Sequence, residues 1–288
     1  GTYLISKKAR ESGIIVALGG DGGDELFGGY ERYLTGNKLL FLKKYLPRIV
    51  FNYANLSSKV LPDFLRQMVG DFAGIDNIKD KFEKFFNNLD DFNDKESLYL
   101  ACLSKWDKEN FDELGCGNNL LLNYESINYI ENKNLDLRTY MMIMDIDNYL
   151  VDDVLVKTDR ASMSLGLEIR APFLNHNLVT YANNIPNASK FSSNGGKVHL
   201  KKILQKYVNK QHIKRPKKGF SIPIDQMLRT SAKEWSNEMI LNLKQNNEIP
   251  LNNKLIERIW NEHLTGARNH GLSLWNLIML SSWLNIWR

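Results

Sequence analysis

The sequence contains very little cysteine and no long hydrophobic run. Its 288 residues include two cysteines, Cys102 and Cys116, which are too few for a disulfide scaffold or a four-ligand zinc site. The most apolar stretch, residues 272–287, is interrupted by serine and asparagine, whereas a membrane-spanning helix needs about 20 predominantly apolar residues. No leader with a basic start and an apolar centre opens the chain. We therefore expect a cytoplasmic protein that does not enter a membrane.

Patterns typical of metal centres and of nucleic-acid binding are also absent. The five histidines show no HExxH or similar metal-ligand spacing, so structural roles are favoured for them. The formal net charge is +5, and the basic excess lies between Lys190 and Lys218. This charge suits an anionic small substrate. No aromatic residues alternate with the basic ones, as they do where bases stack, and we expect no nucleic-acid partner.

Residues 13–18 form a short continuous apolar run, Gly-Ile-Ile-Val-Ala-Leu, that is rich in β-branched residues. Such a run predicts a strand buried on both faces, as in a parallel sheet. It leads directly into a glycine-rich segment at 19–29. A buried strand that ends in a glycine-rich turn before a helix is where α/β proteins usually bind ligands.

The rest of the chain has the three- and four-residue apolar spacing of helices. The predicted helices are 37–50, 79–89, 96–103, 136–150, 152–165, 198–208, 224–243, 251–263 and 272–286. Asp152 or Asp153 is a candidate N-cap for the helix at 152–165. A parallel strand needs neighbours, and no second buried strand is evident downstream. We therefore expect the remaining strands upstream of Gly1, and a helix-dominated α/β fold.

Three segments carry residues suited to chemistry. Glycine occupies four of the seven positions 19–25, and the other three are acidic. Glycine lets the backbone approach an anion closely, and neighbouring acids could hold Mg²⁺ or move a proton. A tight strand-to-helix turn whose acids favour the helix N-terminus is the simpler alternative.

The other two segments are basic. Lys157 and Arg160 are three residues apart and therefore share a helix face, where they could bind phosphates or pair with Asp153 or Asp159. Residues 214–218 contain four cations. A proline lies among them and a glycine follows them. This composition is equally typical of an ordered loop over an anionic site and of a basic surface loop.

Together these segments resemble the synthetase domain of the glutamine-hydrolysing asparagine synthetase B family. Residues 18–30, L-G-G-D-G-G-D-E-L-F-G-G-Y, resemble the family's L-S-G-(D/E)-G-x-D-E-x-F-G-G-Y. The segments D-R-A-S-M at 159–163 and L-E-I-R-A-P-F-L at 167–174 resemble D-R-x-S-M and L-E-x-R-x-P-F-L. The segment R-P-K-K-G-F-S-I-P at 215–223 resembles R-x-K-x-G-F-x-x-P. The three motifs occur in the family's order and span nearly the whole chain.

The resemblance implies a fold and a reaction. The fold would be the C-terminal part of an adenine-nucleotide-hydrolase-like (ATP-pyrophosphatase), Rossmann-like domain. Residues 1–36 would supply a strand and the ligand loop, and 37–288 a mainly helical region with site segments at 152–174 and 214–223. Such enzymes activate a carboxylate with MgATP as an acyl-adenylate. Ammonia from glutamine, released in an N-terminal glutaminase domain, then forms the amide, as in the conversion of aspartate to asparagine.

The resemblance also assigns roles residue by residue. Asp21 would serve proton transfer beside the adenylate, and Lys217 would stabilise negative charge in the transition state. The remaining assignments are nucleotide contacts for Gly19, Gly20, Gly22, Lys157 and Arg160, and Mg²⁺ ligands for Asp24 and Glu25.

The sequence departs from the family in two ways. Gly19 stands where the family usually has serine, and the pyrophosphate-binding S-G-G-x-D-S loop does not occur. Residues 193–197, Ser-Asn-Gly-Gly-Lys, imitate that loop poorly because they lack its aspartate. The glutaminase domain is missing as well. We therefore expect the chain to be incomplete and inactive alone.

Several alternatives stay open. Residues 22–26, G-G-D-E-L, nearly spell the G-G-D-E-F of diguanylate cyclases, but that family would leave the other two motifs unexplained. The chain could also be a non-catalytic scaffold that pairs with a separate upstream half. Similar sequences amidate other carboxylates, including sugar acids, or close a β-lactam ring. A homodimer is compatible with the sequence.

Overall fold

The computed structural model describes residues 1–34, 36, 95–106, 108–116, 135–192, 195–213, 222–246 and 248–288. The chain divides into two compact units. The first unit comprises Gly1–Lys44 and Asn123–Phe220, and the second comprises Tyr45–Leu122 and Ser221–Arg288. The predicted helices at 37–50 and 79–89 lie outside the described residues, as does most of the basic segment at 214–223.

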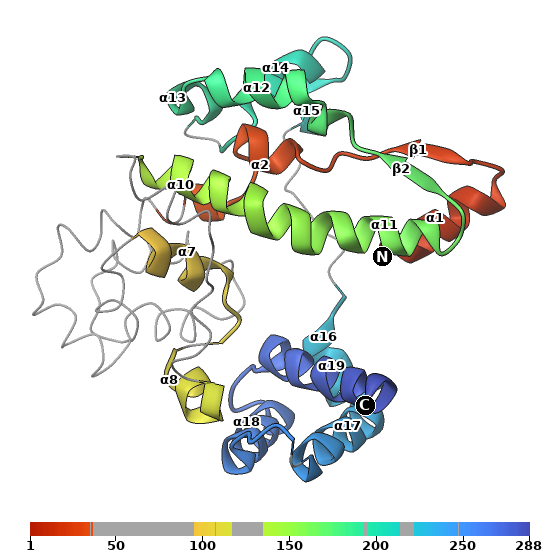
Figure 1. Ribbon diagram of the computed structural model, residues 1–288, viewed down its shortest axis with the longest axis vertical. Helices are drawn as coiled ribbons and strands as arrows, with labels where there is room; N and C mark the ends of the chain where they lie inside the picture. The colour runs from red at the N-terminus through yellow and green to blue at the C-terminus, as the bar shows by residue number, and fades with distance from the viewer. Residues whose placement is uncertain are drawn as a thin grey trace, which may run out of the picture. The chain divides into compact units, whose positions relative to one another are not determined.

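The first unit contains the two described strands and most of the predicted site (Figure 1). Its elements are α1 (Thr2–Glu11), β1 (Val16–Leu18), α2 (Gly23–Phe27), α10 (Leu137–Met144), η2 (Asp145–Leu155), α11 (Val156–Met163), β2 (Glu168–Arg170), η3 (Pro172–Leu174), α12 (His176–Asn184), α13 (Asn187–Lys190), α14 (Val198–Leu204) and α15 (Lys210–Ile213). The described residues are therefore mainly helical with a small parallel sheet, which confirms a helix-dominated α/β class.

The segments α10, η2 and α11 form one continuous helix, which crosses the first unit in Figure 1. Met144 and Val156, at the two junctions, have right-handed helical dihedrals. Asp136 caps its start, because its side chain accepts hydrogen bonds from the backbone N–H groups of Arg138 and Thr139. The predicted break and cap near Asp152 are wrong, because that aspartate lies inside η2.

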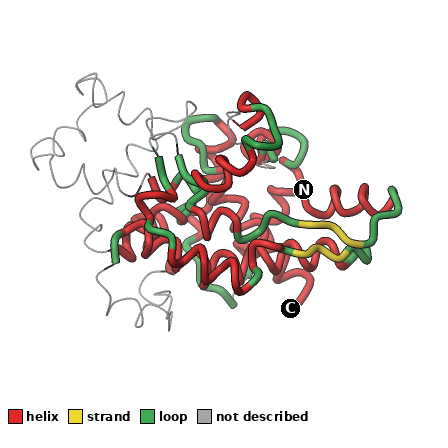
Figure 2. Tube along the Cα trace, turned by 90° about the horizontal axis from the view of Figure 1, so that it is seen from above, coloured by secondary structure: helices red, strands yellow, loops and turns green. Residues whose placement is uncertain are grey.

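The sheet corrects two predictions. A second strand does occur downstream, since β1 pairs in parallel with β2, with Val16 opposite Glu168 and Leu18 opposite Arg170 (Figure 2). The sequence Glu-Ile-Arg of β2 alternates charged and apolar residues, so no apolar run marks it. Nor is β1 buried on both faces, because 42% of Val16 and 75% of Leu18 are exposed.

Two contacts fix the sheet and the helix that follows it. Arg10 at the end of α1 donates from Nε to the Leu165 carbonyl at 3.2 Å, just after α11. The apolar side of α2 is anchored because Leu26 and Phe27 are buried in a cluster with Ala182 of α12. The Phe27 ring meets Phe173 edge-on at 6.1 Å. The helix at the end of the glycine-rich loop is therefore anchored against α12 and η3.

The second unit is helical throughout its described part. Its elements are α7 (Lys95–Leu103), α8 (Lys108–Phe111), η1 (Asp112–Cys116), α16 (Ile224–Arg229), α17 (Lys233–Gln245), α18 (Asn253–Thr265) and α19 (Gly271–Trp287). The predicted helix at 224–243 is two helices, because Thr230 leaves helical dihedrals (φ −127°, ψ −98°). None of the described helices is long and apolar enough to cross a membrane.

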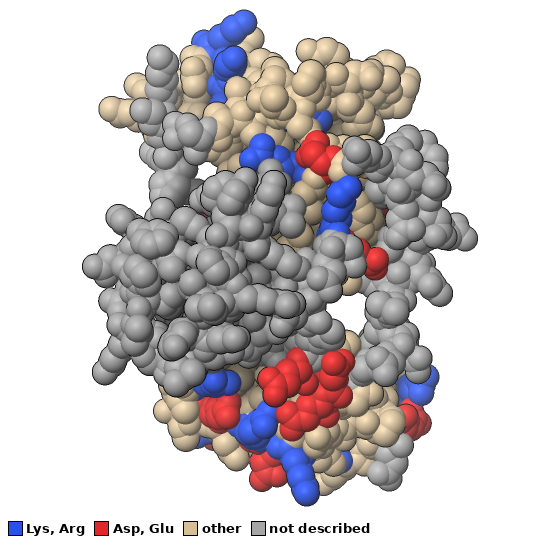
Figure 3. Space-filling model, turned by 90° about the vertical axis from the view of Figure 1, so that its left-hand side faces the viewer, with Lys and Arg blue, Asp and Glu red and all other residues tan. Residues whose placement is uncertain are grey.

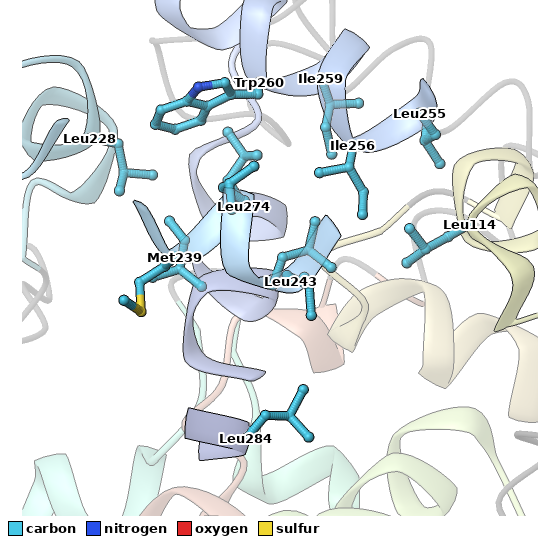
Figure 4. Packing of buried hydrophobic residues seen from close by; sticks show 13 residues of the cluster. Leu114, Leu228, Met239, Leu243, Leu255, Ile256, Ile259, Trp260, Leu274 and Leu284 are labelled. Carbon is cyan, nitrogen blue, oxygen red and sulfur yellow. The ribbon is translucent and has the colours of Figure 1, made fainter. Parts of the chain in front are cut away.

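Apolar side chains from five elements form the core of this unit. Residues of η1, α16, α17, α18 and α19 converge around Leu274 and Leu243 (Figure 4).

Basic and acidic side chains lie next to one another on the face in Figure 3. Within the second unit, the ion pairs include Arg258 with Glu113 at 2.8 Å and Lys244 with Glu257 at 3.1 Å.

Candidate functional site

The glycine-rich loop begins where β1 ends. The Gly19 N–H donates to the Arg170 carbonyl at 2.7 Å, which extends the pairing with β2 by one step. The Gly23 N–H donates to the Gly20 carbonyl at 3.2 Å and closes a tight turn into α2. The turn places Asp21 between the sheet and the helix.

Two of the loop glycines differ in what requires them. Gly22 has φ +84°, and a Cβ there would lie 2.3 Å from Cδ2 of Leu174. The fold itself therefore demands glycine at this position. Around Gly20, by contrast, an added Cβ would meet no atom of the described residues within 4 Å, so within that part of the chain the loop backbone lies open there.

Asp21 and Lys157 lie within electrostatic range of each other. Burial raises the pKa of Asp21 above its ordinary value, and the positive charge of Lys157 partly offsets this. The Lys157 ammonium also lies 3.3 Å from Asp153 Oδ2, one helical turn away. Pairing along the helix face thus does occur, and it leaves Lys157 close enough to act on the loop. Arg160 follows on the same helix and is exposed.

The two predicted magnesium ligands each have a protein partner. Asp24 Oδ2 lies 3.0 Å from the ammonium of Lys197. Glu25 is 1% exposed, and its Oε1 accepts a hydrogen bond of 2.6 Å from the Tyr30 hydroxyl. Burial raises the pKa of Glu25, although the Tyr30 hydrogen bond counteracts it.

This arrangement does not fit a magnesium site built from Asp24 and Glu25. Mg²⁺ needs carboxylate oxygens that can face it together, whereas one of these carboxylates is paired with a lysine and the other is buried. Across the described part of the chain, no group of three or more His, Cys, Asp or Glu side chains is placed to hold a metal ion. The metal role of the two acids stays a prediction.

A buried polar network, which sequence patterns did not single out, lies directly after the loop. Asp145 is completely buried and accepts a hydrogen bond of 2.5 Å from the Tyr33 hydroxyl. The guanidinium of Arg32 binds the same oxygen at 2.8 Å and stacks 3.9 Å from the centre of the Tyr30 ring. The signal in the sequence was a lone aspartate within the apolar helix pattern M-M-I-M-D-I. This network ties the end of the loop to the long helix.

A cavity of about 500 Å³ lies elsewhere in the first unit, between α10, η2, α12 and α13. Lys190, which is 3% exposed, is among its lining residues, as are Asp136 and Asn187. Burial lowers the pKa of Lys190. Asp21, the predicted catalytic residue that the structure describes, does not line it. Lys217 cannot be placed at either location, since it lies outside the described residues.

A glycine-rich, acid-bearing loop at the end of a parallel strand is typical of α/β proteins that bind ligands. Comparison with known proteins identifies the family. The sequence matches the family described as asparagine synthase over residues 1–285. The chain belongs to the asparagine synthase family.

Named relatives agree with this assignment. The chain is 26% identical over 282 residues to a "Putative asparagine synthetase (glutamine-hydrolyzing)" of Mycobacterium tuberculosis H37Rv, covering 98% of this chain and 40% of that protein. It is 24% identical over 289 residues to "Asparagine synthetase (glutamine-hydrolyzing) 1" of Bacillus subtilis 168, covering 99% and 42%. The chain thus spans about two fifths of these relatives' length. No solved structure matches it significantly.

Proposed function

We propose that the chain contributes the synthetase site of an ATP-dependent amide-forming enzyme that acts through an acyl-adenylate. The proposed substrates are ATP, aspartate and ammonia derived from glutamine in a separate glutaminase domain, and the product is asparagine. The observation that carries the proposal is the loop itself. Its backbone is open at Gly20, it bears Asp21, and the positive charge of Lys157 reaches it.

The loop suits a nucleotide. The backbone at Gly20 can approach phosphate oxygens closely, because no side chain of the described residues stands against it. Nucleotide contacts at Gly19 and Gly22 are proposed from the family's motif. Lys157 and Arg160 supply positive charge from the neighbouring helix for the phosphates. No described residue makes a steric demand for glycine at Gly20, and this favours a ligand as the reason for glycine at this position.

Asp21 suits proton transfer. Its pKa is raised by burial, which brings a carboxylic acid closer to the range in which it can accept a proton from attacking ammonia. In the proposed reaction a carboxylate oxygen of aspartate attacks the α-phosphorus, and pyrophosphate leaves. Ammonia then attacks the acyl carbon and gives up one proton to Asp21, and AMP leaves as its bond to the acyl carbon breaks. Lys217 is proposed to stabilise the negative charge that builds up on the phosphate oxygens in the transition state.

The experiment is ATP–pyrophosphate exchange with aspartate, measured on the full-length gene product. Lys217→Ala should abolish exchange, whereas Asp21→Asn should retain exchange and lose asparagine formation, because the proposed proton transfer follows adenylation. Asp153→Asn, which removes an exposed carboxylate beside Lys157 but off the loop, is the matched control and should retain it. Exchange supported only by another carboxylate, such as a sugar acid, would keep adenylation and replace the substrate. Silence with every carboxylate would favour the scaffold alternative.

A further inference from the structure

Lys197 belongs to the segment 193–197, which the proposed function leaves without a role. It precedes α14 and reaches α2, where its ammonium lies 3.0 Å from Asp24 Oδ2. The two side chains are only 28% and 21% exposed. A partly buried pair of this kind is screened less by water and salt than a surface pair.

The backbone of Lys197 is held in the conformation that the pair requires. Lys197 has φ +59°, and it is the one non-glycine residue with positive φ in the described part of the chain. Its N–H donates to the Phe27 carbonyl at 2.8 Å. A lysine persists in this conformation only when its surroundings enforce it, and here the end of α2 does so.

Gly29 makes room for the pair, and the neighbouring Gly196 makes room for the backbone of Gly28. A Cβ at Gly29 would lie 2.0 Å from Asp24 Oδ1 and 2.3 Å from Cε of Lys197. A Cβ at Gly196 would lie 1.6 Å from the Gly28 carbonyl oxygen. Gly29 therefore lies against one carboxylate oxygen of Asp24, and Lys197 binds the other.

We propose that Lys197, and not a divalent metal ion, is the cation that neutralises Asp24, and that the pair locks the glycine-rich loop to α14. A metal ion could bind Asp24 only by displacing the lysine and repacking Gly29. The pair depends on no step of amide formation, so the proposal holds whether or not the proposed function does.

The test is Mn²⁺ binding to the full-length protein without nucleotide, followed by electron paramagnetic resonance. Asp24→Asn should leave Mn²⁺ binding unchanged, because Asp24 does not bind metal in the wild type. Lys197→Gln should create or tighten a Mn²⁺ site at least tenfold by releasing the carboxylate. The double variant should lose that gain, and Lys202→Gln, an exposed lysine of the same helix, should behave as wild type.

Stoichiometric Mn²⁺ binding by the wild type that Asp24→Asn abolishes would overturn the proposal. That comparison uses only the wild type and Asp24→Asn, so the proposal remains testable even where Lys197→Gln fails to fold. Lys197→Arg, which retains the charge, should still exclude the metal ion. A Mn²⁺ affinity in Lys197→Gln equal to that of the wild type would also contradict the proposal.

Discussion

At the scale of single residues, Gly22 tests what the fold requires and Gly20 tests what a ligand requires. Gly22→Ala should destabilise the protein by about 1–3 kcal/mol, because alanine is strained at positive φ and its Cβ would clash with Leu174. Gly20→Ala should leave stability within about 0.5 kcal/mol, because its Cβ meets no atom of the described residues. Denaturant unfolding measures both changes.

Gly20→Ala also tests nucleotide binding. Gly20→Ala should weaken ATP binding, measured by calorimetry, because its methyl group would stand where the phosphates approach. Unchanged ATP affinity in Gly20→Ala would mean that the open backbone at this position is not used.

Glu25 should make stability depend on pH. Burial raises its pKa in the folded protein above its ordinary value, so the folded state binds the proton more tightly than the unfolded state. The contribution of Glu25 to stability is therefore complete below the unfolded pKa, and it is lost as pH rises through the folded pKa.

The variant Glu25→Gln keeps an oxygen for the Tyr30 hydroxyl and removes the titration. Its free energy of unfolding relative to wild type should rise as pH increases from about 4.5 upward. Denaturant unfolding at each pH measures this difference. The exposed Asp153→Asn serves as control. A difference between Glu25→Gln and wild type that is flat with pH would contradict this account.

At the scale of elements, the long helix formed by α10, η2 and α11 holds the end of the loop through Asp145. Asp145→Asn should destabilise the protein by about 3 kcal/mol, because it leaves the guanidinium of Arg32 without its charged partner. Asp147→Asn, on the same helix and exposed, should change stability by less than about 0.5 kcal/mol. Thermal unfolding of the two variants measures this difference. Equal effects would show that Asp145 does not anchor the loop.

The elements also show what the sequence could and could not predict. Local patterns sufficed for α18 and α19, because the apolar spacing of each helix lies within its own segment. The cap of α18 at Asn252 is local as well. They failed for β2, because its three residues are of mixed polarity and its partner strand β1 lies far away in the sequence. They also failed at Thr230, where one residue's dihedrals break a helix inside an uninterrupted apolar pattern.

The candidate site divides in the same way. The loop and its acids were found because glycine density is a local signal. The partners of those acids were not, since Lys197 and Tyr30 are ordinary residues in sequence, and only the fold brings Lys197 to Asp24. The network around Asp145 likewise joins residues more than a hundred positions apart. Predictions on Lys217 remain predictions.

At the scale of the whole molecule, family membership and the loop support one central proposal, which is adenylation of a carboxylate beside the loop that bears Asp21. The first unit supplies the strand, the loop and the helix with Lys157. The second unit is a separate helical core. The chain covers about two fifths of its named relatives, so the claim concerns the synthetase reaction, and the glutamine-dependent supply of ammonia stays a proposal.

The most direct measurement follows an oxygen atom. Aspartate labelled with ¹⁸O in its side-chain carboxylate is incubated with ATP, Mg²⁺ and ammonia and the full-length protein, and the nucleotide products are analysed by mass spectrometry. An acyl-adenylate transfers one labelled oxygen to AMP, so we predict labelled AMP with the wild type and with Asp153→Asn, and none with Asp21→Asn. Label in inorganic phosphate together with ADP would instead show an acyl phosphate and contradict the account.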